Sequence, residues 1–340
     1  MGGFGGPNGW WRAERTYTPT RKLAMNRLTA GPLPANTRGM DDATPPAPAP
    51  PATPLGATLL ETTPYRLERP AAAATPVICA SPHSGRIYPL AMMAASQLDR
   101  RAIRRSEDAH VDDLIAGASG FGHTLIAAQF ARAFIDVNRE PWELDPAMFS
   151  DELPAFAKAR TARVAAGLGA IARIVCEGQE IYARKLTFAE AEGRVREVHQ
   201  PYHTALSALI AETKAQSGLA ILIDWHSMPA AAASGRNGEP CDFVLGDRFG
   251  AACATAVSGL VDRELGAMGY RVARNTPYAG GYTTEHYGRP GRKVHALQIE
   301  INRALYFDEA AMQLTTGFAT LKADLERLFA ALAAQDWSGL

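Results

Sequence analysis

Residues 219–224 have the sequence LAILID, an apolar run that is unbroken until its last residue. A run this short and this apolar is typical of a central parallel strand buried on both faces. A sheet with such a strand needs helices on both sides to cover it. The segments before and after this run should therefore supply neighbouring strands and the covering helices.

Strand-like and helix-like patterns alternate along the chain from residue 74 onward. We expect further strands at residues 75–80, 124–130, 134–137 and 295–302. We expect helices at residues 90–105, 107–118, 249–268 and 308–335, and at least two long helices within residues 151–216. This alternation predicts the α/β class: a single domain with a mixed, mainly parallel central sheet flanked by helices.

The first 55 residues differ from the rest of the chain. Residues 1–40 are rich in Gly, Pro, Thr and Arg, and residues 41–54 are dominated by Ala and Pro. Such a segment cannot bury enough apolar surface to offset its chain entropy. Its basic residues are not followed by the apolar stretch of a secretory signal. We therefore expect a disordered leader at residues 1–55 and a folded domain at residues 56–340.

Charge and cysteine usage narrow the classes of partner. Lys and Arg total 35 and Asp and Glu total 35, a balance that predicts neither nucleic acid nor a membrane surface as partner. The four cysteines lack the CxxC spacing of a metal or redox motif, so we expect reduced thiols and a cytoplasmic protein. A small molecule remains the expected partner, and an acidic one needs only one or two well-placed arginines.

Two histidines follow predicted strands. His83 lies in a PHSG turn after residues 75–80, and His226 follows residues 219–224 in the segment DWHSM. Open α/β sheets bind ligands at the carboxyl ends of their strands, where two imidazoles could ligate zinc. Asp224 is close enough in sequence to fix the tautomer of His226. The alternative for either ring is an ordinary histidine with satisfied hydrogen bonds.

A catalytic zinc site usually has three protein ligands and one open position. The third ligand should be a carboxylate or a histidine from a neighbouring segment. Glu107, Asp108 and Asp112 are the acidic candidates, and we favour Asp108. The alternative is that these acids only oppose the dipole of a helix that begins there.

Alternation along residues 295–302 puts Leu297 and Ile299 on one face and Gln298 and Glu300 on the other. A buried carboxylate is costly unless it is paired or functional. Burial should raise the pKa of Glu300 towards neutrality, which suits a general base. The alternative is a buried ion pair between Glu300 and Arg303.

Arg132 and Arg139 bring two guanidinium groups near another predicted strand end, and Asn138 lies beside the second. Guanidinium groups bind carboxylates through paired, planar hydrogen bonds. An acidic amino-acid substrate is therefore expected here. The alternative is structural pairing with Asp136 or Glu143.

Seven segments, in this order, resemble the N-formylglutamate amidohydrolase family over about residues 75–310. They are PHSGRIYP, SEDAHVDDL, ARAFIDVNR with the following LDP, DWHSMP, DFVLGDRFG, NTPYAGGYTTEHYG and ALQIEINRALYFDE. The resemblance implies a fold similar to the zinc carboxypeptidases and to the aspartoacylase and succinylglutamate desuccinylase group.

In those relatives a His-x-x-Glu motif and a later histidine hold the metal, and a late glutamate is the base. The resemblance maps His83, His226 and Glu300 onto the first histidine, the later histidine and the base. Arg86 stands where the motif has its glutamate, so the carboxylate ligand must come from elsewhere. Asp108 is the candidate that matches the family.

The resemblance implies one Zn²⁺ per chain and hydrolysis of N-formyl-L-glutamate to formate and L-glutamate, as in histidine breakdown. Arg132 would stabilise the oxyanion. Substrate binding would fall to Asn138, Arg139, Gly281, Tyr282 and Arg303. Two alternatives stay open: an N-acyl amino acid deacylase or carboxypeptidase-like peptidase with another substrate, and a catalytically silent binding protein on the same fold.

Overall fold

The apolar run at residues 219–224 forms the centre of strand β4, Ala220–Met228, in which every residue is buried. The computed structural model describes residues 62–71, 73–175, 178–235 and 238–340, all within one unit, Thr53–Leu340. The predicted leader at residues 1–55 lies outside the described residues.

Strand β4 lies at the centre of a sheet whose strand order within the described residues is β1-β3-β2-β4-β7-β5-β6. The other strands are β1 (Tyr65–Glu68), β2 (Val77–Ser81), β3 (Thr124–Ala128), β5 (Phe243–Gly246), β6 (Val272–Arg274) and β7 (Val294–Asn302). Strands β3, β2, β4 and β7 run parallel, whereas β1 and β5 are antiparallel to their neighbours β3 and β7. The predicted mixed, mainly parallel α/β sheet is confirmed.

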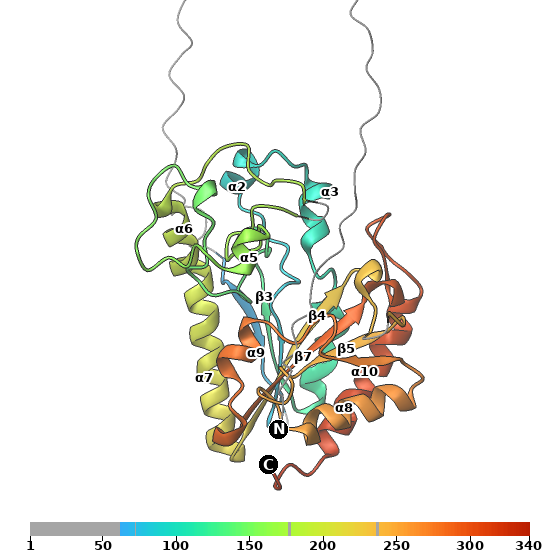
Figure 1. The fold of residues 1–340 in the computed structure, drawn as a ribbon. Coiled ribbons are helices and arrows are strands. Elements are labelled where there is room, and N and C mark those ends of the chain that lie inside the picture. Colours follow the sequence, from blue (N-terminus) through green and yellow to red (C-terminus); the bar gives the residue numbers. More distant parts are fainter. Residues whose placement is uncertain (1–61, 72, 176–177, 236–237) are drawn as a thin grey trace, which may run out of the picture. The chain divides into compact units, whose positions relative to one another are not determined.

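Helices cover both faces of this sheet (Figure 1). They are α2 (Leu90–Ala95), α3 (Arg100–Ile103), α4 (Val111–Leu114), α5 (Ala162–Ala165), α6 (Phe188–Arg194), α7 (Gln200–Ser217), α8 (Thr255–Ala267), α9 (Tyr282–Tyr287) and α10 (Gly317–Ala334). A π-helical turn, Val195–His199, joins α6 to α7. In the described part of the chain, no helix is long and apolar enough to cross a membrane.

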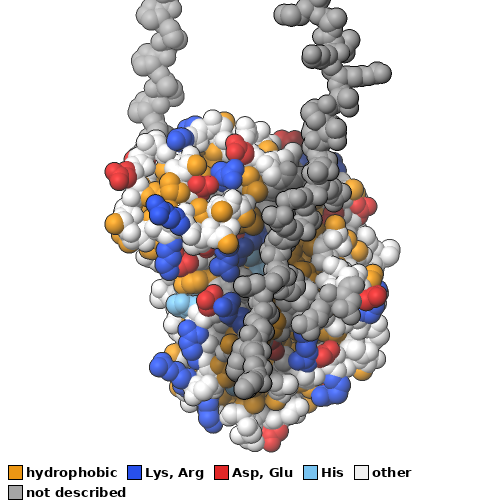
Figure 2. Space-filling model, in the orientation of Figure 1, with side chains coloured by type: hydrophobic (Ala, Val, Ile, Leu, Met, Phe, Trp, Pro, Cys, Tyr) orange, Lys and Arg blue, Asp and Glu red, His pale blue; other side chains and the backbone are white. Residues whose placement is uncertain are grey.

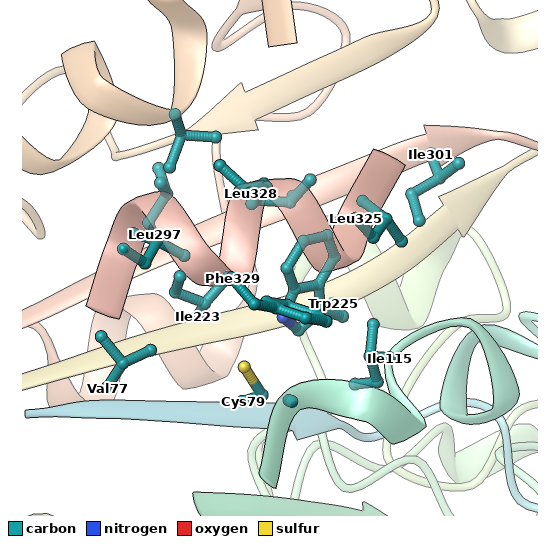
Figure 3. Packing of buried hydrophobic residues seen from close by; sticks show 14 of the residues in the cluster. Val77, Cys79, Ile115, Ile223, Trp225, Leu297, Ile301, Leu325, Leu328 and Phe329 are labelled. Carbon is teal, nitrogen blue, oxygen red and sulfur yellow. The ribbon is translucent and has the colours of Figure 1, made fainter. Parts of the chain in front are cut away.

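Alternation along β4 divides the core into two layers. Ile223 and Trp225 point to one face, where α8 and α10 pack, and the rings of Trp225 and Phe329 meet edge to face at 5.8 Å (Figure 3). Leu222 points to the other face, where it joins a cluster that includes Tyr202 of α7. Asp224 and His226 share this second face, because side chains two residues apart in a strand point the same way.

Several predicted elements differ from the observed ones. Residues 134–137 form turns and no strand, although their apolar side chains are buried. Residues 151–186 contain only the four-residue helix α5 as α-helix among the described positions, so the prediction of two long helices within 151–216 was wrong in its first half. Helix propensity in this Ala-rich stretch is a weak preference, which a Pro and several Gly residues and the packing of the segment override.

Other predicted helices were too long. Residues 90–105 and 107–118 contain short helical pieces, and residues 249–268 are helical only from Thr255. The closing helix begins at Gly317, because β8 (Phe307–Asp308) and β9 (Gln313–Leu314) form a small hairpin before it. Strands β1, β5 and β6 were missed, since three or four residues give too short a pattern to recognise.

The face shown in Figure 2 carries both basic and acidic side chains, and neither kind covers the whole face. This arrangement agrees with the equal totals of basic and acidic residues.

Candidate active site

The parallel strands bring the chemistry-bearing residues to one edge of the sheet. His83 lies two residues after the end of β2, and His226 pairs in register with Glu300 across β4 and β7. Asp108 lies in the turn before α4, where its backbone N–H donates to the carbonyl of His83 at 3.1 Å. Residues from four separated parts of the sequence therefore meet at the carboxyl ends of the parallel strands.

His83, Asp108 and His226 form a buried cluster that could hold a metal ion. The Nδ1 atoms of the two histidines are 3.1 Å apart, and Asp108 Oδ2 lies 3.4 Å from His83 Nδ1 and 3.1 Å from His226 Nδ1. Ligands at about 2.0–2.1 Å from a tetrahedral zinc would be separated by about 3.3 Å. The three donor atoms therefore have nearly the spacing of one face of such a tetrahedron.

The outer nitrogen of each histidine faces a carboxylate. His83 Nε2 lies 2.6 Å from Asp136 Oδ1, and His226 Nε2 lies 3.0 Å from Asp224 Oδ2. Carboxylate acceptors favour the tautomer with the proton on Nε2, which leaves each Nδ1 lone pair facing the other. In this tautomer both Nδ1 lone pairs are available to one metal ion, whereas without a metal an Nδ1 atom can carry a proton and donate to Asp108 Oδ2. The arrangement therefore fits a metal.

The electrostatics of the cluster also favour a cation. Burial alone would lower the pKa of His226, but the charge of Asp224 and the hydrogen bond to Asp108 raise it well above its usual value. Burial would raise the pKa of Asp108, yet hydrogen bonds from His226 and His83 hold it well below its usual value. Metal-free, the site thus takes up positive charge, which a divalent ion would supply in its place.

Glu300 faces this cluster from the neighbouring strand. Its side chain is buried, and burial, followed by the nearby charge of Asp108, raises its pKa to about 7. Gln298 Nε2 donates to Glu300 Oε1 at 2.8 Å, and the Gly281 N–H donates to Gln298 Oε1 at 2.7 Å. These two bonds fix the orientation of the Gln298 amide and hence one oxygen of Glu300.

Two arginines contact the carboxylates of the cluster. Arg132 Nη2 pairs with Asp136 Oδ2 at 2.8 Å, and Arg132 Nη1 lies 3.7 Å from Asp108 Oδ1. Arg303 Nη2 pairs with Asp108 Oδ1 at 3.1 Å, and Arg303 Nε donates to Ser227 Oγ at 3.0 Å. Arg132 thus pairs with Asp136, the structural partner that was considered as an alternative to substrate binding. The alternative ion pair between Glu300 and Arg303 is not the one observed, because Arg303 pairs with Asp108 and Glu300 accepts a hydrogen bond from Gln298.

Asn138 lies between the cluster of His83, Asp108 and His226 and the loop before α9. Its Oδ1 accepts from the Thr283 N–H at 2.8 Å, and its Nδ2 lies 3.4 Å from Asp224 Oδ2. A Cβ added at Gly281 would meet the Asn138 amide at 2.6 Å. Only glycine allows the loop to approach the Asn138 side chain this closely.

Arg139 differs from Arg132 and Arg303 in its partners. It donates to the carbonyl oxygens of Leu168 and Asn138, and among the described residues no carboxylate is paired with it. Burial, and then the charges of Arg132 and Arg163, lower its pKa. A half-buried guanidinium with no carboxylate partner among the described residues can bind an anion.

These groups line a cavity of about 580 Å³. Its described walls hold three carboxylates, Asp108, Asp136 and Glu300, together with five arginines. The arginines are Arg105, Arg132, Arg139, Arg163 and Arg303. A cavity that combines a candidate metal cluster, a carboxylate with a pKa near neutrality and several guanidinium groups is suited to hydrolysis of an anionic substrate.

Known proteins share both the sequence pattern and the fold. The family model described as N-formylglutamate amidohydrolase matches residues 75–307, more than half of the chain. The chain belongs to this family. It is therefore an amidohydrolase.

Individual members of the N-formylglutamate amidohydrolase family show how far the likeness extends. The N-formylglutamate deformylase of Pseudomonas aeruginosa is 31% identical over 240 residues, which cover 69% of this chain and 84% of that protein. The corresponding protein of Pseudomonas putida is 28% identical over 240 residues, with 69% and 82% covered. The crystal structure of an N-formylglutamate amidohydrolase from Ralstonia eutropha JMP134 has a TM-score of 0.77 and 37% identity, covering 82% of this chain and all (100%) of that one. A gene product from Agrobacterium tumefaciens, at 18% identity and a TM-score of 0.58, shares the fold.

Most of the residues predicted for this amidohydrolase lie in the cavity wall. They are His83, Asp108, Arg132, Asn138, Arg139, His226, Gly281, Glu300 and Arg303. Asp224 lies behind His226 and is fully buried. Tyr282 is not part of the cavity wall: its ring stacks on His286 and meets His203 edge to face. The other acidic candidates lie elsewhere, since Glu107 bonds Tyr88 and Arg104, and Asp112 bonds Arg86.

Sequence reasoning missed two residues that support the amidohydrolase site. Asp136 was considered only as a partner for arginine, yet it also accepts a hydrogen bond from His83. Gln298 was recognised as a neighbour of Glu300 on one strand face but not as its hydrogen-bond donor. A signal for both existed, because each lies two residues from a predicted functional residue.

Proposed function

We propose that this enzyme hydrolyses the amide bond of an N-formyl acidic amino acid, with N-formyl-L-glutamate as its substrate and formate and L-glutamate as products. A single observation carries the proposal: the cavity places the His83, Asp108 and His226 cluster beside Glu300 and beside Arg139, a guanidinium without a carboxylate partner among the described residues. The names of the two Pseudomonas relatives and of the Ralstonia structure support the same substrate.

We propose that His83, Asp108 and His226 hold one zinc ion. Two nitrogen donors and one carboxylate match the ligand types of catalytic zinc, and their spacing fits its size. When bound, the ion would polarise the formyl carbonyl and lower the pKa of a coordinated water. Asp136 and Asp224 would hold the two imidazoles in the ligating tautomer.

Glu300 would act as the general base. With a pKa of about 7, its carboxylate can accept the proton of the attacking water and later release it to the leaving amine. In this reaction the C–N amide bond breaks, a C–O bond forms at the formyl carbon, and the amine gains the proton. Arg132, beside the carboxylates of the cluster, would stabilise negative charge on the carbonyl oxygen.

Substrate recognition would rest on guanidinium groups. Arg139 would bind a substrate carboxylate through paired hydrogen bonds, and Asn138 would bind beside it. Arg303, which also lines the cavity, would bind a second carboxylate or hold Asp108. We also propose a cytoplasmic enzyme, a location supported by free and buried Cys79, Cys241 and Cys253.

The test is turnover by zinc-loaded protein of N-formyl-L-glutamate, N-formyl-L-glutamine, N-acetyl-L-glutamate and N-succinyl-L-glutamate. The proposal expects kcat/KM to be highest for N-formyl-L-glutamate, and lower for N-formyl-L-glutamine because its amide cannot pair with Arg139. A higher kcat/KM for an acetyl or succinyl substrate would identify a deacylase of another acyl group. Full turnover without any bound metal would refute the metal assignment.

A further inference from the structure

Residues 134–137, which directly precede Asn138 and Arg139, were predicted to form a strand, yet they form turns among buried apolar residues. Within the described residues no strand pairs with the backbone of residues 134–139, so the buried carbonyl groups of this segment need donors from elsewhere. Three such carbonyls, those of Phe134, Val137 and Arg139, accept hydrogen bonds from side chains.

All three donors come from one helical rod that runs through α6, the π-helical turn and α7. Arg194 Nη1 donates to the Phe134 carbonyl at 3.0 Å. His199 Nε2 lies 2.9 Å from the Arg139 carbonyl oxygen, and His203 Nε2 lies 2.7 Å from that of Val137. The two histidines therefore hold the carbonyls on either side of Asn138.

The π-helical turn explains how these donors face the same segment. Val195–His199 forms one turn with the wider π spacing, in which residues five positions apart lie on the same side of the helix. Arg194 and His199 are five positions apart, so both can face this segment. His203 then follows His199 by one ordinary α-helical turn, and their ring centroids are 4.4 Å apart. Such π-helical turns often mark functional sites in proteins.

Helix α9 fixes the tautomer of His203. Tyr287 Oη lies 2.8 Å from His203 Nδ1, and its hydroxyl can donate to that nitrogen. The proton of His203 then lies on Nε2, which donates to the Val137 carbonyl. Burial, followed by the charges of His199 and His286, lowers the pKa of His203 to about 3, so the ring stays neutral. Figure 1 shows α9 beside α7.

We propose that His203, assisted by His199 and oriented by Tyr287, is a positioning residue for substrate binding. It holds the backbone from Val137 to Arg139, and thereby the side chains of Asn138 and Arg139, against the cavity. This inference rests on the proposed function, in which Arg139 binds a substrate carboxylate. None of these three aromatic side chains lines the cavity itself.

The first test separates substrate binding from chemistry. His203→Leu removes the donor to Val137 and should raise KM for N-formyl-L-glutamate by about tenfold, with kcat within about threefold of wild type, because the metal ligands and Glu300 stay in place. His203→Gln keeps an N–H at the same reach and should restore KM to within about threefold. Tyr287→Phe should raise KM less than His203→Leu. His286→Leu, at an exposed histidine of the same ring cluster, is the matched control and should leave both constants unchanged.

The second test needs no turnover. In His203→Leu, the amides of Asn138 and Arg139 should exchange hydrogen about tenfold faster, while β4 and α7 keep their protection and the metal content is unchanged. An unchanged KM together with unchanged exchange would overturn the inference. Faster exchange throughout β4 and α7, with a lower Tm and no rescue by Gln, would also overturn it, because His203 would then serve the fold alone. If the wild type does not hydrolyse N-formyl-L-glutamate, the proposed function fails, and the exchange experiment still decides whether His203 holds this segment.

Discussion

Replacing Glu300 with Gln is expected to lower activity and raise stability at the same time. Burial raises the pKa of Glu300 from 4.5 to about 7 in the folded protein. The difference of about 2.5 pH units corresponds to about 3 kcal/mol by which the folded state disfavours the ionised carboxylate. Gln has nearly the same shape and can accept the same bond from Gln298, but it cannot ionise.

The sign of the effect follows from linkage between protonation and folding. Below pH 4.5 the carboxyl group is protonated in both states and contributes nothing to the pH dependence. As the pH rises from 4.5 to about 7, the unfolded chain loses the proton first, so the wild type loses stability. Above pH 7 the loss is complete. The metal-free Glu300→Gln variant should therefore equal the wild type near pH 4.5 and exceed it by about 3 kcal/mol at pH 8.

Urea unfolding of metal-free protein at both pH values measures this difference, and kcat of the metal-loaded variant measures the chemistry. The expected loss in kcat is at least about a thousandfold, because Gln cannot accept the proton of the attacking water. The same substitution at the exposed Glu192 is the control and should change neither quantity. Equal stability of variant and wild type at pH 8 would refute the burial argument. Retention of a tenth of the wild-type kcat would remove Glu300 from the mechanism.

Three further predictions concern the metal, the substrate and the leader. His83→Ala and His226→Ala should each lose the bound zinc in elemental analysis of purified protein, and full retention in both would show that the ligands are wrong. Arg139→Ala should weaken kcat/KM for N-formyl-L-glutamate by about 2–4 kcal/mol and far less for N-formyl-L-glutamine; equal losses would mean that Arg139 binds the α-carboxylate or supports the fold. Deletion of residues 1–55 should leave Tm and turnover nearly unchanged, as the family match begins at residue 75, and a large decrease in either would assign the leader a role.

The sequence predicted those strands whose residue types are set by burial alone. The apolar run in β4 and the mainly apolar pattern of β7 identified two central strands, because burial on both faces restricts residue type directly. The run at residues 134–137 is also mostly apolar, but its carbonyls are bonded by Arg194 of α6 and His203 of α7, about sixty positions away. Local composition cannot report such distant donors.

The candidate site also contains residues that a local sequence pattern could identify and residues that only the fold could identify. His83, His226 and Glu300 were recognisable because each lies at or near the end of a strand. Asp108 could be separated from Glu107 only by the fold, since the two are adjacent in sequence and only the turn before α4 decides which side chain meets the histidines. Tyr282 follows Gly281 directly in sequence, but at the start of α9 its ring stacks on His286 and it does not line the cavity.

The proposed zinc site would have a consequence for the amount of enzyme in a cell. Asp108, Asp136 and Asp224 surround two imidazoles whose Nδ1 atoms converge, so the negative charge of the three carboxylates favours a cation at this point. A zinc ion at a hundred times its dissociation constant would add about 2.7 kcal/mol to the stability of the native state. Folded protein that lacks the ion would open more often and be degraded sooner. Under the proposed occupancy, scarce zinc would therefore reduce how many copies of the enzyme persist, in addition to the fraction that is active.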